Sequence, residues 1–196
     1  MCAAGTMPGE LHKLWKAGRP GSYHMEYGFS CMGYEIAGAI GIKMAEPDRD
    51  VICMLGDGSY MMMNSELATA AMMGIKITVV ITDNRGFGCI NRLQRATGGA
   101  EFNNLLDHAV HETPSNIDFV AHAASMGAEA VKAGSIADLE ALSWDIRQDQ
   151  LYLDTVEELE ARLHLSDSPQ SARRIQEELE AMTREMDARS RPEQDS

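Results

Sequence analysis

The stretch VICMLGDGSYMMMNSELATAAMMGIKITVVITDNRGFG, residues 51–88, decides the fold of this chain. A continuous apolar run from Val51 to Leu55 ends at a Gly-Asp-Gly-Ser turn, and the β-branched run from Ile75 to Thr82 ends at Asp-Asn-Arg-Gly. Between them, the residues from about Asn64 to Met73 favour a helix that stops at Gly74. Because a strand, a crossover helix and a second strand make one βαβ unit, we expect the two strands to be parallel.

The residues outward from this unit continue the alternation of helix and strand. Two further helices are predicted, from about Cys31 to Glu46 and from Asn116 to Ser125, the second capped by Asn116 or Ser115. All 17 glycines lie at or before Gly134, as expected where tight turns connect short elements. The front of the chain is therefore predicted to be an α/β domain, an open parallel sheet flanked by helices.

The end of the chain has a different composition. The last 54 residues, 143–196, carry 14 acidic residues and 7 arginines, which is a net charge of −7 out of −13 for the whole chain. We therefore divide the chain into a domain over residues 1–142 and an acidic helical tail over residues 143–196. Apolar residues recur in the tail at spacings of three and four on both sides of a Ser-Asp-Ser-Pro breaker, which predicts a helical hairpin: Val156, Leu159, Leu163, Ile175, Leu179, Met182 and Met186.

Charge and cysteine content exclude several classes of protein. A net charge of −13 repels phosphate backbones and anionic lipid surfaces, so we expect neither nucleic acid nor a membrane as a partner. The longest apolar run has the length of a strand, well below the roughly 18 residues of a membrane span. The four cysteines form no close-spaced pair, which is typical of reduced thiols in a cytoplasmic protein.

Polar side chains follow each of the two predicted strands. Asp57 comes directly after the first strand, and Asn84 follows the second. Since the carboxyl ends of parallel strands meet at one edge of a sheet, these side chains are expected to stand side by side. A carboxylate, an amide oxygen and a nearby backbone carbonyl are ligands that suit Mg²⁺ with water and phosphate oxygens in its other positions.

The same stretch resembles the signature of thiamine diphosphate-dependent enzymes, in which GDG is followed some two dozen residues later by an asparagine pair. Here 24 residues separate Gly58 from Asp83, which replaces the first asparagine. The resemblance implies the thiamine diphosphate-binding fold. It also implies that Asp57, Asn84 and the carbonyl of Gly86 bind Mg²⁺, with Asn84 also at the cofactor, and that Gly58 and Ser59 lie against the diphosphate.

A second segment, Tyr27–Tyr34, resembles the family stretch that lies under the aminopyrimidine and thiazolium rings of the cofactor. Met32 falls where these enzymes place a bulky apolar side chain that bends the cofactor, and Ser30, in the same segment, is also expected to bind the cofactor. The alternative interpretation is that Met32 only fills the core. The topology of the family implies further positions near the cofactor or the substrate: Gly5, Thr6, His24, Tyr27, Cys89 and Asn91.

Longer segments resemble one branch of this family, the trihydroxycyclohexanedione hydrolases of myo-inositol catabolism. They are MPGELHKLW from Met7, GSYHMEYGFSCMGYEIAG from Gly21, NRGFGCINRLQ from Asn84 and GGAEFNNLL from Gly98. The implied reaction starts when the cofactor ylide adds to a carbonyl of a cyclic 1,2-diketone. A carbon–carbon bond then breaks, and water releases an open-chain acid.

The activating glutamate of the family lies on a pyrimidine-binding domain that the resemblance does not cover. Glu26, Glu35 and Glu66 belong to the wrong domain to replace it, so no catalytic residue is assigned here and a partner is expected, either a separate pyrimidine-binding chain or a second copy of this chain. Against the family pattern the domain is expected to be truncated at both ends. Three hypotheses stay open: a ring-opening component, another carboligase or decarboxylase component, and a non-catalytic remnant.

Overall fold

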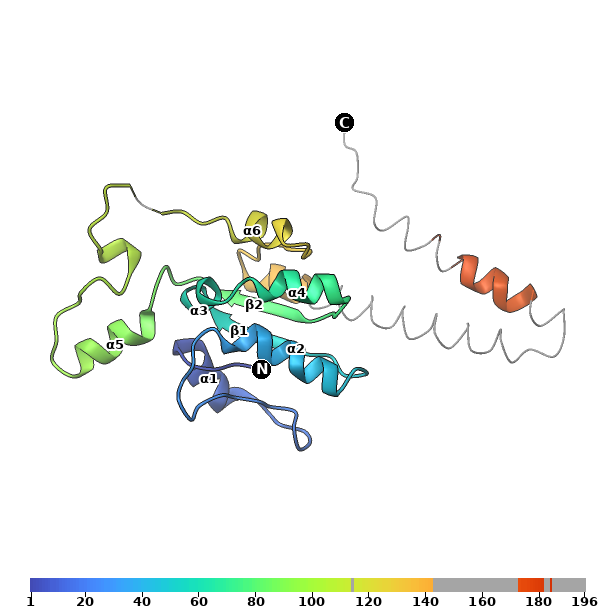
Figure 1. Ribbon diagram of the computed structural model, residues 1–196, viewed down its shortest axis with the longest axis horizontal. Coiled ribbons are helices and arrows are strands. Elements are labelled where there is room, and N and C mark those ends of the chain that lie inside the picture. The colour runs from blue at the N-terminus through green and yellow to red at the C-terminus, as the bar shows by residue number, and fades with distance from the viewer. Residues whose placement is uncertain (114, 143–172, 182–183, 185–196) are drawn as a thin grey trace. The chain divides into compact units, whose positions relative to one another are not determined.

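The computed structural model describes all residues except 114, 143–172, 182–183 and 185–196. The chain divides into two compact units, Met1–Val131 and Lys132–Ser196, and the predicted boundary near Leu142 stays a prediction. In chain order, the helices and strands of the first unit are α1 (Thr6–Leu14), α2 (Tyr34–Ala45), β1 (Ile52–Gly56), α3 (Asp57–Met62), α4 (Glu66–Met73), β2 (Thr78–Thr82), α5 (Gly88–Ala96), the 3-10 helix η1 (Leu106–His108) and α6 (Phe119–Ser125) (Figure 1).

The two predicted strands pair in parallel, which confirms the α/β class. Ile52 lies opposite Thr78, and Gly56 lies opposite Thr82 at the carboxyl end. β2 begins at Thr78 instead of the predicted Ile75 because the N–H of Ile75 donates to the carbonyl of Ala70 and completes the end of α4. The pairing brings the two polar turns that follow the strands to the same edge of the sheet.

The amino-terminal residues extend this parallel arrangement on the other side of β1. The amino group of Met1 donates to the carbonyl of Ile52 (2.7 Å), and the N–H of Met54 donates to the carbonyl of Met1 (2.9 Å). Cys2 then forms a parallel bridge with Met25. The helix that follows, α1, also contacts β1.

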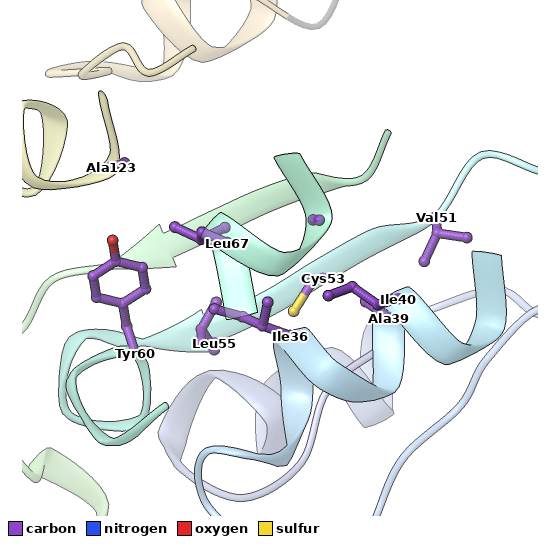
Figure 2. Packing of buried hydrophobic residues seen from close by; sticks show 10 residues of the cluster. Ile36, Ala39, Ile40, Val51, Cys53, Leu55, Tyr60, Leu67 and Ala123 are labelled. Atoms are coloured by element: carbon purple, nitrogen blue, oxygen red, sulfur yellow. The ribbon is translucent and has the colours of Figure 1, made fainter. Parts of the chain in front are cut away.

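The core lies on one face of the sheet, under α2 and α4. Alternate residues of β1 point to opposite faces, so Cys53 and Leu55 are buried in the core while Ile52 is 40% exposed on the other face. Figure 2 shows Ile36 of α2 beside Cys53 and Leu55, and Leu67 of α4 belongs to the same cluster. The first turns of α2 and α3 meet through a hydrogen bond from Ser59 to Glu35 (2.6 Å).

Two helix starts differ from the predictions. α2 begins at Tyr34 and not at Cys31, because Gly33 has a left-handed backbone (φ 90°) that cannot continue a helix. α6 begins at Phe119, and its cap is Asp118, whose Oδ1 accepts the N–H of Ala121 (3.0 Å), in place of Ser115 or Asn116. Short polar side chains cap helices interchangeably, so spacing alone did not single out the residue in use.

Among the described residues of the first unit, three α-helices and the 3-10 helix η1 were not predicted from the sequence. α3 starts at Asp57 itself, inside the stretch interpreted as a turn. α1 has Gly9 in its interior, where glycine lowers helix propensity, and α5 begins at Gly88. Figure 1 shows α5 beyond the end of β2, away from the sheet.

The predicted helical hairpin of the tail lies mostly outside the described residues. Residues 173–181 form a helix that contains Ile175 and Leu179, while Val156, Leu159, Leu163, Met182 and Met186 are not described. In the part of the chain that the structure describes, no helix is both long and apolar enough to cross a bilayer.

Candidate cofactor and metal site

The carboxylate of Asp57 joins the two turns at the carboxyl edge of the sheet. Asp57 is the first residue of α3, directly after β1, and is only 6% exposed. Its Oδ2 accepts the N–H of Gly86 (2.7 Å), and its Oδ1 accepts the N–H of Asn84 (3.4 Å). The side chain therefore lies against the turn that follows β2, as expected for neighbouring parallel strands.

The described residues compensate the charge of Asp57 only in part. Burial raises the pKa of its carboxyl group, and the hydrogen bonds from Gly86 and Asn84 oppose that shift without cancelling it. Among the described residues, no lysine, arginine or histidine forms an ion pair with Asp57. A nearby cation would stabilise a buried carboxylate that has no ion pair, because the cation favours its ionised form.

The backbone of the second turn requires glycine at position 86. Gly86 has φ 142°, and a Cβ atom there would lie 2.5 Å from the carbonyl oxygen of Asn104. Hydrogen bonds on both sides hold the turn, from the N–H of Phe87 to Asn104 (2.7 Å) and from the N–H of Leu106 to Arg85 (2.8 Å). The position of the Gly86 backbone is therefore set by the segment around residues 104–106.

Gly58 lets the two turns pack closely. A Cβ atom on Gly58 would lie 2.7 Å from the ring of Phe87 and 3.4 Å from the carbonyl oxygen of Gly86. The side chain of Asn84 lies beside Gly88, the first residue of α5, where a Cβ atom would be 3.1 Å from Asn84 Nδ2. Asp57, Gly58, Asn84 and Gly86 thus come together, although residues 59–82 separate the two turns.

The oxygen atoms at this edge fit the predicted magnesium site. One carboxylate, one amide and one backbone carbonyl make a hard donor set, and a diphosphate and water would complete an octahedron. No group of three or more histidine, cysteine, aspartate or glutamate side chains with metal-binding geometry occurs among the described residues. A site with a single carboxylate suits a metal ion that takes its other ligands from a bound cofactor. Such a metal anchors phosphate groups.

The side chain of Ser59, another predicted site residue, points inward. It is buried, its hydroxyl donates to Glu35 Oε1 (2.6 Å), and its Oγ accepts the N–H of Gly33 (2.9 Å). Only the backbone of Ser59 is thus available to an anion outside. That Ser59 lies against the diphosphate stays a prediction.

The turn with Ser30 and Met32 lies beside the end of α3. Gly33 closes this turn, and a Cβ atom on Gly33 would lie 2.8 Å from Met63 Cγ. Ser30 has a left-handed backbone (φ 52°) and is exposed, whereas Met32 is half-buried. The structure therefore places the segment predicted to lie under the cofactor rings next to the Gly-Asp-Gly-Ser turn, which was predicted to face the diphosphate.

The remaining predicted positions are more dispersed. Gly5 (φ 133°) precedes α1, and Thr6 is the first residue of that helix. The side chain of Asn91 is buried and donates to Glu101 Oε1 (3.1 Å), a contact within the segment after β2. The remaining three, His24, Tyr27 and Cys89, make no described hydrogen bond to Asp57, Asn84 or Gly86.

Sequence reasoning missed two residues that shape the site. The ring of Phe87 lies against Gly58, and the buried carboxylate of Glu35 joins Ser59 to Gly33. A glutamate two residues after a glycine and beside an apolar helix face is a weak signal in sequence, since most glutamates on helices are solvated. Its partner Ser59 lies in another element, so local spacing could not identify the contact.

Comparison with known proteins identifies the family of this chain. Residues 3–150 match the family model described as "Thiamine pyrophosphate enzyme, C-terminal TPP binding domain". The chain is similar to a 3D-(3,5/4)-trihydroxycyclohexane-1,2-dione hydrolase of Shouchella clausii, with 43% identity over 76% of this chain and 23% of that protein. A second such hydrolase, from Bacillus cereus, is 46% identical over 70% of this chain and 22% of its own length. The chain thus spans about a quarter of the length of these relatives.

A solved structure gives the same result for the fold. A thiamine diphosphate-dependent 4-hydroxybenzoylformate decarboxylase of Rhodococcus jostii RHA1 superposes with a TM-score of 0.51 and 25% identity, over 59% of this chain and 21% of that one. The family match covers most of the chain, and it includes both turns at the edge of the sheet. This chain belongs to the family of thiamine pyrophosphate enzymes, as a C-terminal TPP-binding domain.

Proposed function

We propose that this chain is the thiamine diphosphate- and Mg²⁺-binding part of a hydrolase that opens the ring of trihydroxycyclohexane-1,2-dione in myo-inositol catabolism. The observation that carries the proposal is the contact of Asp57 with the Asn84–Gly86 turn, where a buried carboxylate that forms no ion pair with the described residues accepts the N–H groups of Asn84 and Gly86. The names of the two relatives at 43% and 46% identity support the choice of substrate.

Each residue of the site has a role in this proposal. Asp57, Asn84 and the carbonyl of Gly86 hold Mg²⁺, and the open backbone at Gly58 admits the diphosphate. Met32 supports the cofactor rings from the turn beside α3. When bound, thiamine diphosphate supplies a nucleophilic carbon and an electron sink for breaking a carbon–carbon bond. The residues of this chain bind and orient that cofactor.

The proposed reaction also involves a partner. The activating glutamate is proposed to come from a pyrimidine-binding domain, on a separate chain or in a homo-oligomer. The exposed Tyr27 and Phe29, next to the turn that carries Ser30, support a partner surface on this side, because large apolar side chains are enriched in protein interfaces.

All four cysteines are free, which supports a reducing compartment such as the cytoplasm.

Calorimetric titration with thiamine diphosphate in the presence of Mg²⁺ tests the proposed binding. We expect the chain to bind, and Asp57→Ala to abolish binding because it removes the carboxylate at the junction of the turns. Asp50→Ala is the matched control, since Asp50 is exposed at the opposite end of β1. Absence of binding by the unaltered chain at millimolar cofactor would leave the non-catalytic remnant as the better interpretation of this chain.

A second assay separates the substrates. With the pyrimidine-binding partner added, ring opening of the cyclic diketone supports the proposed reaction, whereas turnover of pyruvate or a benzoylformate favours a carboligase or decarboxylase. The structural likeness to a 4-hydroxybenzoylformate decarboxylase is the observation that favours this second candidate. No turnover of either class with a partner that itself binds the chain would contradict both.

A further inference from the structure

Glu35 is a fully buried carboxylate that the proposed cofactor contacts do not use. It lies in the first turn of α2, and its exposed fraction is 0%. Its Oε2 accepts the N–H of Gly33 (2.8 Å), and its Oε1 accepts the hydroxyl of Ser59 (2.6 Å). Ser59 Oγ in turn accepts the same N–H of Gly33 (2.9 Å). Glu35, Ser59 and Gly33 thus form a closed triangle of hydrogen bonds.

A carboxylate in such a place costs free energy unless its oxygens are satisfied. Here both oxygens accept a hydrogen bond, and the amino end of α2 adds the favourable field of its peptide dipoles. In the described part of the chain, no lysine, arginine or histidine pairs with Glu35. The carboxylate of Glu35 therefore binds two neutral donors, the N–H of Gly33 and the hydroxyl of Ser59. Both donors lie at the edge of the sheet.

The two turns face opposite ends of the proposed cofactor. Gly33 closes the turn with Ser30 and Met32, which is proposed to support the rings. Ser59 ends the Gly-Asp-Gly-Ser segment at the start of α3, which is proposed to face the diphosphate. Because Ser59 donates its only proton to Glu35, its hydroxyl has no hydrogen left for a phosphate oxygen. Any contribution of the Ser59 side chain to cofactor binding is thus indirect.

We propose that Glu35 is a positioning residue. It holds Ser59, at the start of α3, and the turn that ends at Gly33 at the spacing that thiamine diphosphate requires. This inference rests on the proposed cofactor function and adds a residue to it. Glu35 acts through Ser59 and Gly33 and does not touch the cofactor itself.

A double-mutant cycle on cofactor affinity tests the inference. In Glu35→Gln the amide keeps one acceptor oxygen but presents a donor to its second partner, so we expect the dissociation constant for thiamine diphosphate with Mg²⁺ to rise about tenfold, which is 1.4 kcal/mol. Ser59→Ala should weaken binding to a similar degree, and the double variant should be no weaker than either single variant. Glu46→Gln, at the exposed far end of α2, is the matched control and should bind as the unaltered chain does.

Two results of the cycle would overturn the inference. One is unchanged affinity in Glu35→Gln. The other is a double variant whose loss equals the product of the single losses, because Ser59 would then act on the cofactor independently of Glu35. A merely structural role would lower the melting temperature and leave the affinity of the folded protein unchanged, which also counts against the proposal.

Amide hydrogen exchange of the cofactor-free chain separates this inference from the proposed function. Glu35→Gln should accelerate exchange at Gly33, while Met54 in β1, whose N–H donates to Met1, keeps its protection. If the unaltered chain does not bind cofactor, the proposed function fails, and the exchange at Gly33 still decides whether Glu35 holds the turns. Should Glu35→Gln not fold, Ser59→Ala replaces it, and unchanged exchange at Gly33 in that variant would refute the inference.

Discussion

The carboxylate of Glu26, a partly buried residue, orders the turn that carries Ser30. Its two oxygens accept the N–H groups of Cys31 (2.7 Å) and Phe29 (3.0 Å). These backbone hydrogen bonds favour the ionised form and hold the pKa of Glu26 below its usual value. The hydrogen bond from Cys31 has the larger effect, and that from Phe29 adds to it. The left-handed backbone of Ser30 lies between the two donors and is stabilised by the same contacts.

The order of this turn is therefore expected to depend on pH. A lowered pKa means that the stabilisation is fully present above the ordinary glutamate pKa of about 4.3 and is lost as the pH falls through the lower pKa of the folded state. The amide NMR signals of Phe29 and Cys31 should shift with a midpoint below that ordinary value. In Glu26→Gln this titration should be absent, and a midpoint at or above the ordinary value in the unaltered chain would contradict the assignment.

Asp57 and Ser59 illustrate how far sequence reasoning reaches at the scale of residues. That Asp57 meets the second turn was predictable, because parallel strands align their carboxyl ends whatever the details of packing. The inward direction of Ser59 was not predictable, since it depends on a hydrogen bond to Glu35, 24 residues earlier in the chain.

At the scale of elements, the turn after β2 depends on one glycine. In Gly86→Ala the added Cβ meets Asn104 at a backbone angle that other residues rarely adopt, so we expect the free energy of unfolding to fall by roughly 2 kcal/mol or more. Gly98→Ala is the matched control, because Gly98 also has a positive φ (86°) but no atom lies within 4 Å of the added Cβ. Urea denaturation compares the two, and equal losses would show that the contact with Asn104 is unimportant.

The strand β1 has one core face and one half-exposed face. Leu55 is 1% exposed beside α2 and α4, so Leu55→Ala should lower the free energy of unfolding by about 2–5 kcal/mol. Ile52→Ala, in the same strand but on the other face, should cost less than about 1.5 kcal/mol because part of its side chain is already in water. Thermal or urea unfolding of the two variants measures the difference, and a larger loss for Ile52 would mean that the faces are assigned wrongly.

At the scale of the whole molecule, the reactivity of the cysteines shows whether the core of the first unit is closed. Cys2 and Cys53 are buried, and burial raises the pKa of the Cys53 thiol to about 12, whereas Cys31 is exposed. A thiol reagent at neutral pH should therefore modify Cys31 in the native protein and spare Cys2 and Cys53 until the unit unfolds. Mass spectrometry of labelled peptides measures the order, and early labelling of Cys53 would show that the core around β1 opens in the native state.

The sequence by itself determined the parallel βαβ unit and the meeting of Asp57 with Asn84 and Gly86. The reason is that apolar runs, glycine turns and the spacing between them act locally, and the geometry of parallel strands does the rest. The acidic composition of the tail was also readable, although its structure lies mostly outside the described residues.

Only the tertiary structure decided the details that shape the site. The start of α2 at Tyr34, the ring of Phe87 against Gly58, and the buried triangle around Glu35 all depend on contacts between different elements. Such contacts form when burial removes polar groups from water and forces each donor and acceptor to find a partner, which no local pattern of residues specifies.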